Sequence, residues 1–427
     1  MIRLEEAQQF VLDRCRPLPP VDLALEVALG CVVSAPVVAT EAVPPFANSS
    51  MDGYAVRSAD TGDPPVTLSV IGSIMAGHPF DRAVGPGQAA RIMTGAPVPR
   101  GADAVCMIEE TETTADGLRV TVRRALAAGD FVRPPGRDVA VGQVICPAGA
   151  VLTPARLGVL AHQGAATVSA HPRPKVGVLS TGDELFVGAG PLPPGAIRDA
   201  NRPTLLALAR QGGWESVDLG VVKDDEAALV DVLTEGAATC DALITSGGVS
   251  VGDLDLVRVV LEKLCAGSMR WMQVAIRPAK PFAFGVLADS GTPVFGLPGN
   301  PVSAMVSFEL FVRPALRLMG GRLRLHRPVA KARAEVDMGR TADGKLHLVR
   351  ALVSLDPQGG WRVHPTAGQE SHQLHSMAEA NALALLPDGP GASAGDLVDV
   401  LVLDSDTDTD TAADGAGVDH VDGNSSS

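Results

Sequence analysis

Aromatic residues are scarce in this chain of 427 residues: Phe, Trp and Tyr together make up 3% of it, and Tyr54 is the only tyrosine. Aliphatic side chains must therefore fill the hydrophobic cores, and a hydrophobic fraction of 46% is enough for folded domains. The chain is longer than one ordinary core supports, so we expect roughly two to four domains.

Long apolar runs and paired cysteines are also missing. The sequence has no stretch of about 18 apolar residues, so we expect no membrane span. It also lacks a basic segment followed by an apolar one at the N-terminus, so export is not indicated. The six cysteines are scattered without a C-x-x-C pair, as expected for reduced thiols in a cytoplasmic protein. Lys and Arg number 35 against 49 Asp and Glu, a net charge of -14 that argues against a nucleic-acid partner.

The first part of the chain predicts an extended helical segment interrupted by a β-rich lobe. Residues 1–44 and 140–172 carry apolar side chains at helical intervals, at 4–12, 23–29 and 154–164. Between them, residues 45–139 form short β-type runs separated by Gly, Pro and Asp, which predicts an inserted lobe. Its strands are expected at 66–71, 90–93, 104–108 and 118–122.

From residue 173 the pattern changes to strand, loop and helix, and it predicts an α/β domain over 173–322. Such alternation favours a parallel sheet that binds ligands beyond the carboxyl ends of its strands. A small β domain is expected at 323–404, followed by a disordered acidic tail at 405–427. Strands are expected at 176–180, 216–222, 242–245 and 292–296, and helices at 203–211, 225–238, 253–264 and 302–318.

One short stretch raises a hydrolase hypothesis. Residues 248–252 read G-x-S-x-G between an expected strand and an expected helix, which is the setting of a nucleophile elbow with Ser250 as the nucleophile. A glycine-rich loop that cradles an anion looks the same over five residues. Histidines lie downstream, so residue counts alone do not exclude the hydrolase, but the Ser-Gly-Gly-Val loop before Ser250 is looser than an elbow turn and disfavours it.

Three polar loops follow expected strands, at 180–185, 246–253 and 296–303. The second and third combine glycines with a helix start, an arrangement that suits an anionic group. A plain strand-to-helix turn would explain any one loop alone, but three in succession predict a pocket for a phosphorylated ligand.

Charged residues accompany these loops. Carboxylates near an anion pocket suit a bridging Mg²⁺, although each one alone is equally explained as a helix N-cap. The proline-flanked pair Arg277 and Lys280 suits an oxyanion such as phosphate, sulfate or molybdate, with a solvated loop as the alternative. The acids in question are Asp183, Glu184, Asp224, Asp225, Asp253 and Asp255.

Taken together, six sequence blocks resemble the signature of the molybdopterin molybdenumtransferase family, which comprises bacterial MoeA proteins and the gephyrin E domain. Their order and spacing agree from about residue 3 to 403. The blocks are PPF (44–46) with SMDGYAVR (50–57), RIMTGAP (91–97), STGDEL (180–185), SGGVSVGD (246–253), KPFAFG (280–285) and GLPGNPVS (296–303).

The resemblance implies a multidomain α/β homodimer with a MogA-like molybdopterin-binding α/β domain. It also implies the reaction, in which molybdate and adenylylated molybdopterin yield molybdenum cofactor and AMP with Mg²⁺ or another divalent cation. A molybdopterin adenylyltransferase would act upstream, and molybdoenzymes or their chaperones downstream. A pterin-binding scaffold without transferase activity is the alternative within the family.

The resemblance also assigns roles to individual positions, in three groups. The catalytic group is Asp52, Thr94, Asp138, Glu184, Asp224 and Asp255, of which Glu184, Asp224 and Asp255 bind the metal. The group that holds the pterin substrate is Ser180, Thr181, Gly182, Asp183, Ser246, Gly247, Gly248, Ser250, Gly252, Pro298, Gly299, Asn300, Pro301 and Ser303. The molybdate group is Arg277, Lys280, Ser303, Arg350, Ser371 and Ser376.

The chain departs from the family pattern at two neighbouring positions. Arg277 and Ala279 stand where many members carry Lys and Gly. Positive charge is kept at the first position, so oxyanion binding is still expected there, with a different cation geometry.

Overall fold

The computed structural model describes residues 1–78, 80–248 and 256–403, and it divides the chain into two compact units. The first unit contains residues 1–35, 148–153 and those from 167 onward, and the second contains residues 36–147 and 154–166. The expected tail at 405–427, together with Ser250, Gly252, Asp253 and Asp255, lies outside the described residues.

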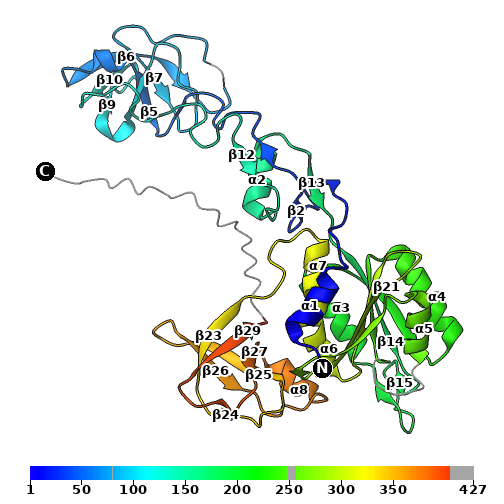
Figure 1. Ribbon diagram of the computed structural model, residues 1–427. Coiled ribbons are helices and arrows are strands. Elements are labelled where there is room, and N and C mark those ends of the chain that lie inside the picture. The colour runs from blue at the N-terminus through cyan, green and yellow to red at the C-terminus, as the bar shows by residue number, and fades with distance from the viewer. Residues whose placement is uncertain (79, 249–255, 404–427) are drawn as a thin grey trace. The chain divides into compact units, whose positions relative to one another are not determined.

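The first unit contains a six-stranded sheet, whose strands β14 and β21 are labelled in Figure 1. Its strand order is β17-β14-β18-β22-β21-β19. The first four strands are parallel, as the strand–helix alternation predicts, and all four were expected. The strands are β14 (Lys175–Thr181), β17 (Glu215–Val222), β18 (Ala242–Ser246), β19 (Arg270–Gln273), β21 (Pro281–Val286) and β22 (Pro293–Leu297).

The sheet is mixed, because β21 and β19 run antiparallel to β22 and to each other. The sequence did not reveal these two strands. Phe282 and Phe284 of β21 are fully buried in the larger core, so packing places this segment in the sheet. No helix separates β19 from β21, which removes the alternation on which the prediction of a parallel sheet depended.

Helices cover both faces of the sheet (Figure 1). Side chains from α4 and α5 build one core with Leu179 and Leu243 of the sheet. Those from the other helices build a larger core with Val178 and Ile244, because neighbouring strand residues point to opposite faces. The helices are α1 (Leu4–Leu12), α3 (Asn201–Gln211), α4 (Glu226–Thr239), α5 (Leu256–Leu264), α6 (Pro301–Ser307) and α7 (Arg313–Met319), with a π-helical turn, η3 (Phe308–Val312), between the last two.

A five-stranded barrel forms the expected C-terminal β domain. Its strands close in the order β25-β26-β23-β29-β27 and back to β25, and β20 (Ile276–Arg277) extends the same sheet from the α/β region. The barrel strands are β23 (Val329–Ala334), β25 (Leu346–Leu355), β26 (Trp361–Pro365), β27 (Ala382–Leu386) and β29 (Leu397–Val402), accompanied by β24 (Met338–Gly339), β28 (Gly391–Ala392) and helix α8 (Leu374–Glu379).

The helix predicted at residues 23–29 is wrong. Residues 21–24 are a strand, and a turn follows them. Val27 and Leu29 are 56% and 46% exposed, so the apolar spacing there does not mark a buried helical face. A small sheet in the order β1-β13-β2 takes its place, formed by β1 (Val21–Ala24), β2 (Val32–Val33) and β13 (Thr167–His171).

The second unit contains the predicted β lobe, a six-stranded sheet in the order β8-β5-β7-β6-β10-β9. The four strands expected there are present, and the helix expected at 154–164 is α2 (Pro154–His162). The sheet strands are β5 (Gly53–Val56), β6 (Val66–Ile74), β7 (Gln88–Ile92), β8 (Ala104–Met107), β9 (Thr111–Thr113) and β10 (Arg119–Val122); the shorter ones are β3 (Val37–Val38), β4 (Asn48–Ser49), β11 (Val132–Arg133) and β12 (Val144–Cys146).

Candidate functional site

The three polar loops predicted from the sequence meet at the carboxyl ends of β14, β18 and β22. These strands are neighbours in the parallel part of the sheet, so the loops that follow them converge at one edge. Residues from the described parts of these loops, at 180–185, 246–248 and 296–303, line a cavity of about 160 Å³. The predicted residues that line it are Ser180, Thr181, Glu184, Ser246, Gly247, Gly299 and Pro301.

Glycine is required at two points of these loops. Gly247 has φ +100°, and a Cβ atom there would lie 2.7 Å from the carbonyl oxygen of Thr181. Gly182 has φ +143°, and a Cβ atom there would lie 2.4 Å from a carboxylate oxygen of Glu184. The close approach at Gly247 is therefore between the first and second loops, whereas Gly182 needs glycine for its backbone conformation within the first loop.

Two residues that the sequence reasoning missed hold this cavity together. The Asn201 side-chain amide donates to Ser246 Oγ at 2.8 Å and to the Gly299 carbonyl at 2.7 Å, so it bridges the second and third loops. Asp199 accepts from Ser180 Oγ at 3.0 Å and from Arg202 Nε at 2.9 Å, which fixes the first loop. The run Arg198-Asp-Ala-Asn201, which leads into the first residue of α3, was the available signal.

Three carboxylates gather beside the cavity. The backbone N–H of Asp224 donates to Asp183 Oδ1 at 3.3 Å. Desolvation raises the pKa of Asp224, and the negative charges of Asp183 and Glu184 raise it further. Their mutual repulsion suits a divalent cation, which would relieve it. Among the described residues no group of three His, Cys, Asp or Glu side chains already has metal-binding geometry, and Asp255 lies outside them.

Asp225 takes the alternative role that the sequence left open. It is the N-cap of α4, and its carboxylate accepts a hydrogen bond from the backbone N–H of Ala228 at 3.0 Å.

A second cavity of about 230 Å³ lies where the segment at 276–281 meets the barrel. It contains most of the predicted oxyanion-binding residues, namely Arg277, Lys280, Ser303 and Ser371, together with Asn300, Lys345 and Glu370. Asn300 donates to Ser371 Oγ at 3.0 Å, which joins the third loop to the barrel. The turn at 299–303 thus borders both cavities: Gly299 and Pro301 line the first, and Asn300 and Ser303 the second.

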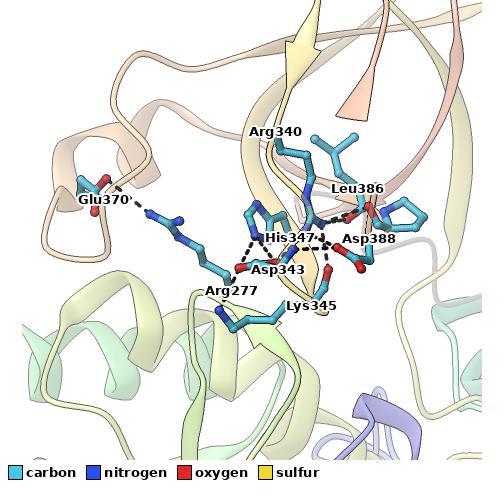
Figure 2. Close-up of polar contacts among 9 residues, drawn as sticks. Arg277, Arg340, Asp343, Lys345, His347, Glu370, Leu386 and Asp388 are labelled. Carbon is cyan, nitrogen blue, oxygen red and sulfur yellow. Dashed lines mark hydrogen bonds and ion pairs between the residues drawn. The ribbon is translucent and has the colours of Figure 1, made fainter. Parts of the chain in front are cut away.

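Arg277 is held by the opposite wall of this second cavity. Its guanidinium lies 3.6 Å from a carboxylate oxygen of Glu370, and the two side chains are 54% and 61% exposed (Figure 2). Exposed pairs of this kind are weak, so an incoming dianion can replace Glu370 at the guanidinium. Lys280 is also exposed and brings a second positive charge to the same cavity.

Ala279 lies between these two cations with φ +71° and is 2% exposed. This left-handed conformation favours glycine, which gives a physical reason why many family members carry glycine here. A non-glycine residue in this conformation costs about 1 kcal/mol or more. The backbone between Arg277 and Lys280 is therefore strained in this chain.

Arg350 and Ser376 do not line the second cavity. Arg350 is fully buried, donates from Nε to Ser376 Oγ at 3.1 Å, and donates to the carbonyls of Gly368 and Glu370. Desolvation lowers the pKa of its guanidinium. In this arrangement Arg350 supports, from inside the barrel, the segment at 368–371 that forms one wall of the cavity.

A third cavity of about 560 Å³ opens on the barrel side of Arg277. In its lining, Asp343 accepts hydrogen bonds from Lys345 and Arg340, and it lies within 3.3 Å of a ring nitrogen of His347 (Figure 2). The contacts with Lys345 and then His347 hold the pKa of Asp343 well below its usual range. This network fixes Lys345 at the wall of the second cavity.

The predicted residues of the β lobe belong to the second unit. Asp52 Oδ1 accepts from the backbone N–H of Thr94 at 2.6 Å and from its hydroxyl at 2.8 Å. These two bonds lower the pKa of Asp52. The structure thus brings Asp52 and Thr94 together, while Asp138 lies on an exposed loop whose backbone N–H donates to the Val43 carbonyl.

Parallel strands whose loops converge on adjacent cavities place this chain in the class of α/β proteins that bind ligands at a sheet edge. The family is shown by comparison with known proteins. Residues 2–164 match the MoeA N-terminal region (domains I and II), residues 177–318 the probable molybdopterin-binding domain, and residues 331–403 the MoeA C-terminal region (domain IV). The chain belongs to the MoeA family of molybdopterin molybdenumtransferases, which are enzymes of molybdenum cofactor biosynthesis.

Similar proteins match along almost their whole length. The chain is 37% identical over 403 residues to the molybdopterin molybdenumtransferase of Haemophilus influenzae, covering 94% of this chain and 98% of that one. It is 38% identical to molybdopterin molybdenumtransferase 2 of Mycobacterium tuberculosis, covering 91% and 96%. A solved molybdopterin biosynthesis MoeA protein from Pyrococcus horikoshii has a TM-score of 0.77 and 27% identity, covering 94% of this chain and 100% of that chain.

These findings confirm the predicted family and fold class, and they do not favour the hydrolase hypothesis for Ser250. No described helix has the length and apolar composition needed to cross a membrane.

Proposed function

We propose that this enzyme inserts molybdate into adenylylated molybdopterin and releases AMP. The observation that supports this most is the turn at 299–303, because it separates the two cavities. A phosphate-bearing pterin in the first cavity and an oxyanion in the second would lie on opposite sides of a single turn. Such proximity is the main requirement for transfer between two bound substrates.

The residues of each cavity divide the work. Arg277 and Lys280 would bind the molybdate dianion, and the hydroxyl of Ser303 would orient it. Ser180, Ser246 and the backbone at Gly247 and Gly299 would hold the pterin phosphates. Arg350, Ser371 and Ser376 would keep the barrel wall in position.

Glu184, Asp224 and Asp255 would hold Mg²⁺. When bound, the cation would offset the charge of the pyrophosphate whose cleavage releases AMP. Asp52, Thr94 and Asp138 are proposed to complete the catalytic set from the β lobe. The proposed homodimer, the cytoplasmic location, the upstream adenylyltransferase and the downstream molybdoenzymes or chaperones rest on family membership alone.

Complementation tests the transferase activity. The gene is expressed in a bacterial strain that lacks its own molybdenumtransferase, and the activity of an endogenous molybdoenzyme is measured. We expect rescue by the wild-type chain and by Lys331→Ala, an exposed lysine of the barrel, and none by Lys280→Ala. A folded wild-type protein that gives no rescue would leave the pterin-binding scaffold as the function.

The metal assignment has its own test in Asp224→Asn. The pKa of Asp224 is raised in the folded protein, so this residue stabilises the fold only in its protonated form. That stabilisation is complete at pH values below the ordinary pKa of Asp, and it is lost as the pH rises through the folded pKa. Without metal at pH 7 the variant should therefore be slightly more stable than the wild type. Mg²⁺ at about 100 times its Kd should stabilise only the wild type, by about 2.7 kcal/mol. Equal thermal shifts with Mg²⁺ in both proteins would exclude Asp224 as a ligand.

A further inference from the structure

A basic cavity of about 400 Å³ lies at the opposite end of the central sheet from the proposed active site. It borders Pro174 and Glu215, where β14 and β17 begin, whereas the substrate cavities lie where the strands end. Among the described residues that line it are four arginines and one histidine against a single carboxylate, Glu215. The basic residues are His171, Arg173, Arg210, Arg317 and Arg322.

Backbone carbonyls fix several of these cations in place. Arg173 donates to the Leu29 carbonyl at 2.5 Å, Arg322 to the Gly30 carbonyl at 2.9 Å, and Arg317 to the Arg324 carbonyl at 2.6 Å. These bonds orient the guanidinium groups around the cavity. Arg173 and Arg210 are exposed and face solvent as well as the cavity lining.

Such a cavity is unexpected in a chain of net charge -14, and half of that charge comes from one segment. Residues 404–427 contain seven Asp and no Lys or Arg, so they contribute -7. The chain enters this segment from β29, whose end contacts the stretch that follows the cavity lining: Leu401 of β29 pairs with Val329, and Arg327 donates to the Val402 carbonyl at 3.4 Å. Arg322, which lines the cavity, is only five residues before Arg327.

The reach of this segment is ample. The five-residue step from Arg322 to Arg327 spans at most about 18 Å. The 24 residues from 404 to 427 can extend up to about 80 Å. Because the segment is tethered, its effective concentration at the cavity is of the order of millimolar. Individually weak Asp–Arg pairs can then act together.

We propose that this cavity is a binding site for acidic peptide and that its occupant is the chain's own segment 404–427. Aspartate carboxylates of the segment pair with the guanidinium groups of the cavity. The binding is electrostatic, so it weakens as salt screens the charges. The inference does not depend on the proposed transferase activity.

The test uses the full chain with a fluorescent label on the segment. All six native cysteines are buried, so Thr411→Cys provides a selective labelling site. The label's anisotropy should be high at 50 mM NaCl and should fall in 1 M NaCl. Arg173→Ala/Arg210→Ala should reduce the docked-to-free ratio about tenfold at low salt. Arg119→Ala/Arg133→Ala removes two exposed arginines of the other unit and should leave the ratio unchanged.

A second variant avoids any change in the folded region. The variant Asp404→Asn/Asp406→Asn/Asp408→Asn/Asp410→Asn should release the label at low salt, while thermal unfolding stays the same. Anisotropy that does not respond to salt overturns the proposal. So does a salt-dependent signal that Arg173→Ala/Arg210→Ala leaves intact, because the segment would then bind elsewhere. The proposal is also overturned if tripolyphosphate binds at the cavity while the label on the segment is free at low salt. That result would show that the cavity binds a small polyanion instead of the segment.

Discussion

Asn201 offers a sharp test of how the first cavity is built. Its amide bridges Ser246 Oγ and the Gly299 carbonyl, so Asn201→Ala removes two hydrogen bonds between the second and third loops. Each such bond contributes about 0.5–1.5 kcal/mol net, which gives a loss of about 1–3 kcal/mol. If the loss is expressed in ligand binding, it corresponds to a roughly 5- to 150-fold weaker affinity. Asn201→Asp should be worse, because its carboxylate would face the Gly299 carbonyl.

Calorimetric titration with AMP, the product of the proposed reaction, measures this effect directly. The matched control is Gln211→Ala, an exposed residue at the other end of α3, which should bind AMP as the wild type does. Melting temperatures of all variants are measured alongside. If Asn201→Ala lowers the melting temperature but binds AMP with wild-type affinity, the bridge supports the fold only, and the reasoning that it shapes the ligand cavity is refuted.

Two further predictions concern Thr94 and Arg350. The hydrogen bonds from Thr94 lower the pKa of Asp52, so the ionised carboxylate stabilises the fold at pH values above the ordinary pKa of Asp. This stabilisation is lost as the pH falls through the folded pKa. Thr94→Val removes only the hydroxyl bond and should raise the Asp52 pKa part of the way, as read by carboxyl NMR titration; an unchanged pKa would contradict the assigned cause. Arg350→Met should destabilise the barrel by about 2–5 kcal/mol in denaturant unfolding, because the three hydrogen bonds from the buried guanidinium to Ser376, Gly368 and Glu370 are lost. If stability were unchanged and only molybdate binding were lost, Arg350 would contact the oxyanion directly.

Local patterns predicted the parallel part of the sheet and its loops well. The strand–helix alternation placed β14, β17, β18 and β22 to within about two residues, because each strand is short, apolar and bounded by turn residues. Residues 23–29 misled the same reasoning. Apolar spacing alone cannot distinguish a buried helical face from exposed side chains such as Val27 and Leu29.

The site was less accessible from sequence because it depends on contacts between distant segments. Asn201 and Asp199 belong to no glycine-rich motif. Asn201 bonds to residues 45 and 98 positions farther along the chain, and Asp199 bonds to a residue 19 positions earlier. Glu370 was missed for the same reason, since its pairing with Arg277 crosses from the barrel to the α/β region. The burial of Arg350 likewise follows from barrel closure, which no local pattern encodes.

The pairing of β20 with β25 sets a rule for building chimeric enzymes. Ile276 and Arg277 align with Leu346 and His347, so the α/β region supplies the outermost strand of the barrel's sheet. An exchange of residues 323–404 with those of a relative would graft a barrel onto a strand that it did not evolve with. A shift of one residue in that pairing would turn the Arg277 side chain to the other face of the sheet. Successful exchanges should therefore carry residues 276–277 together with the barrel.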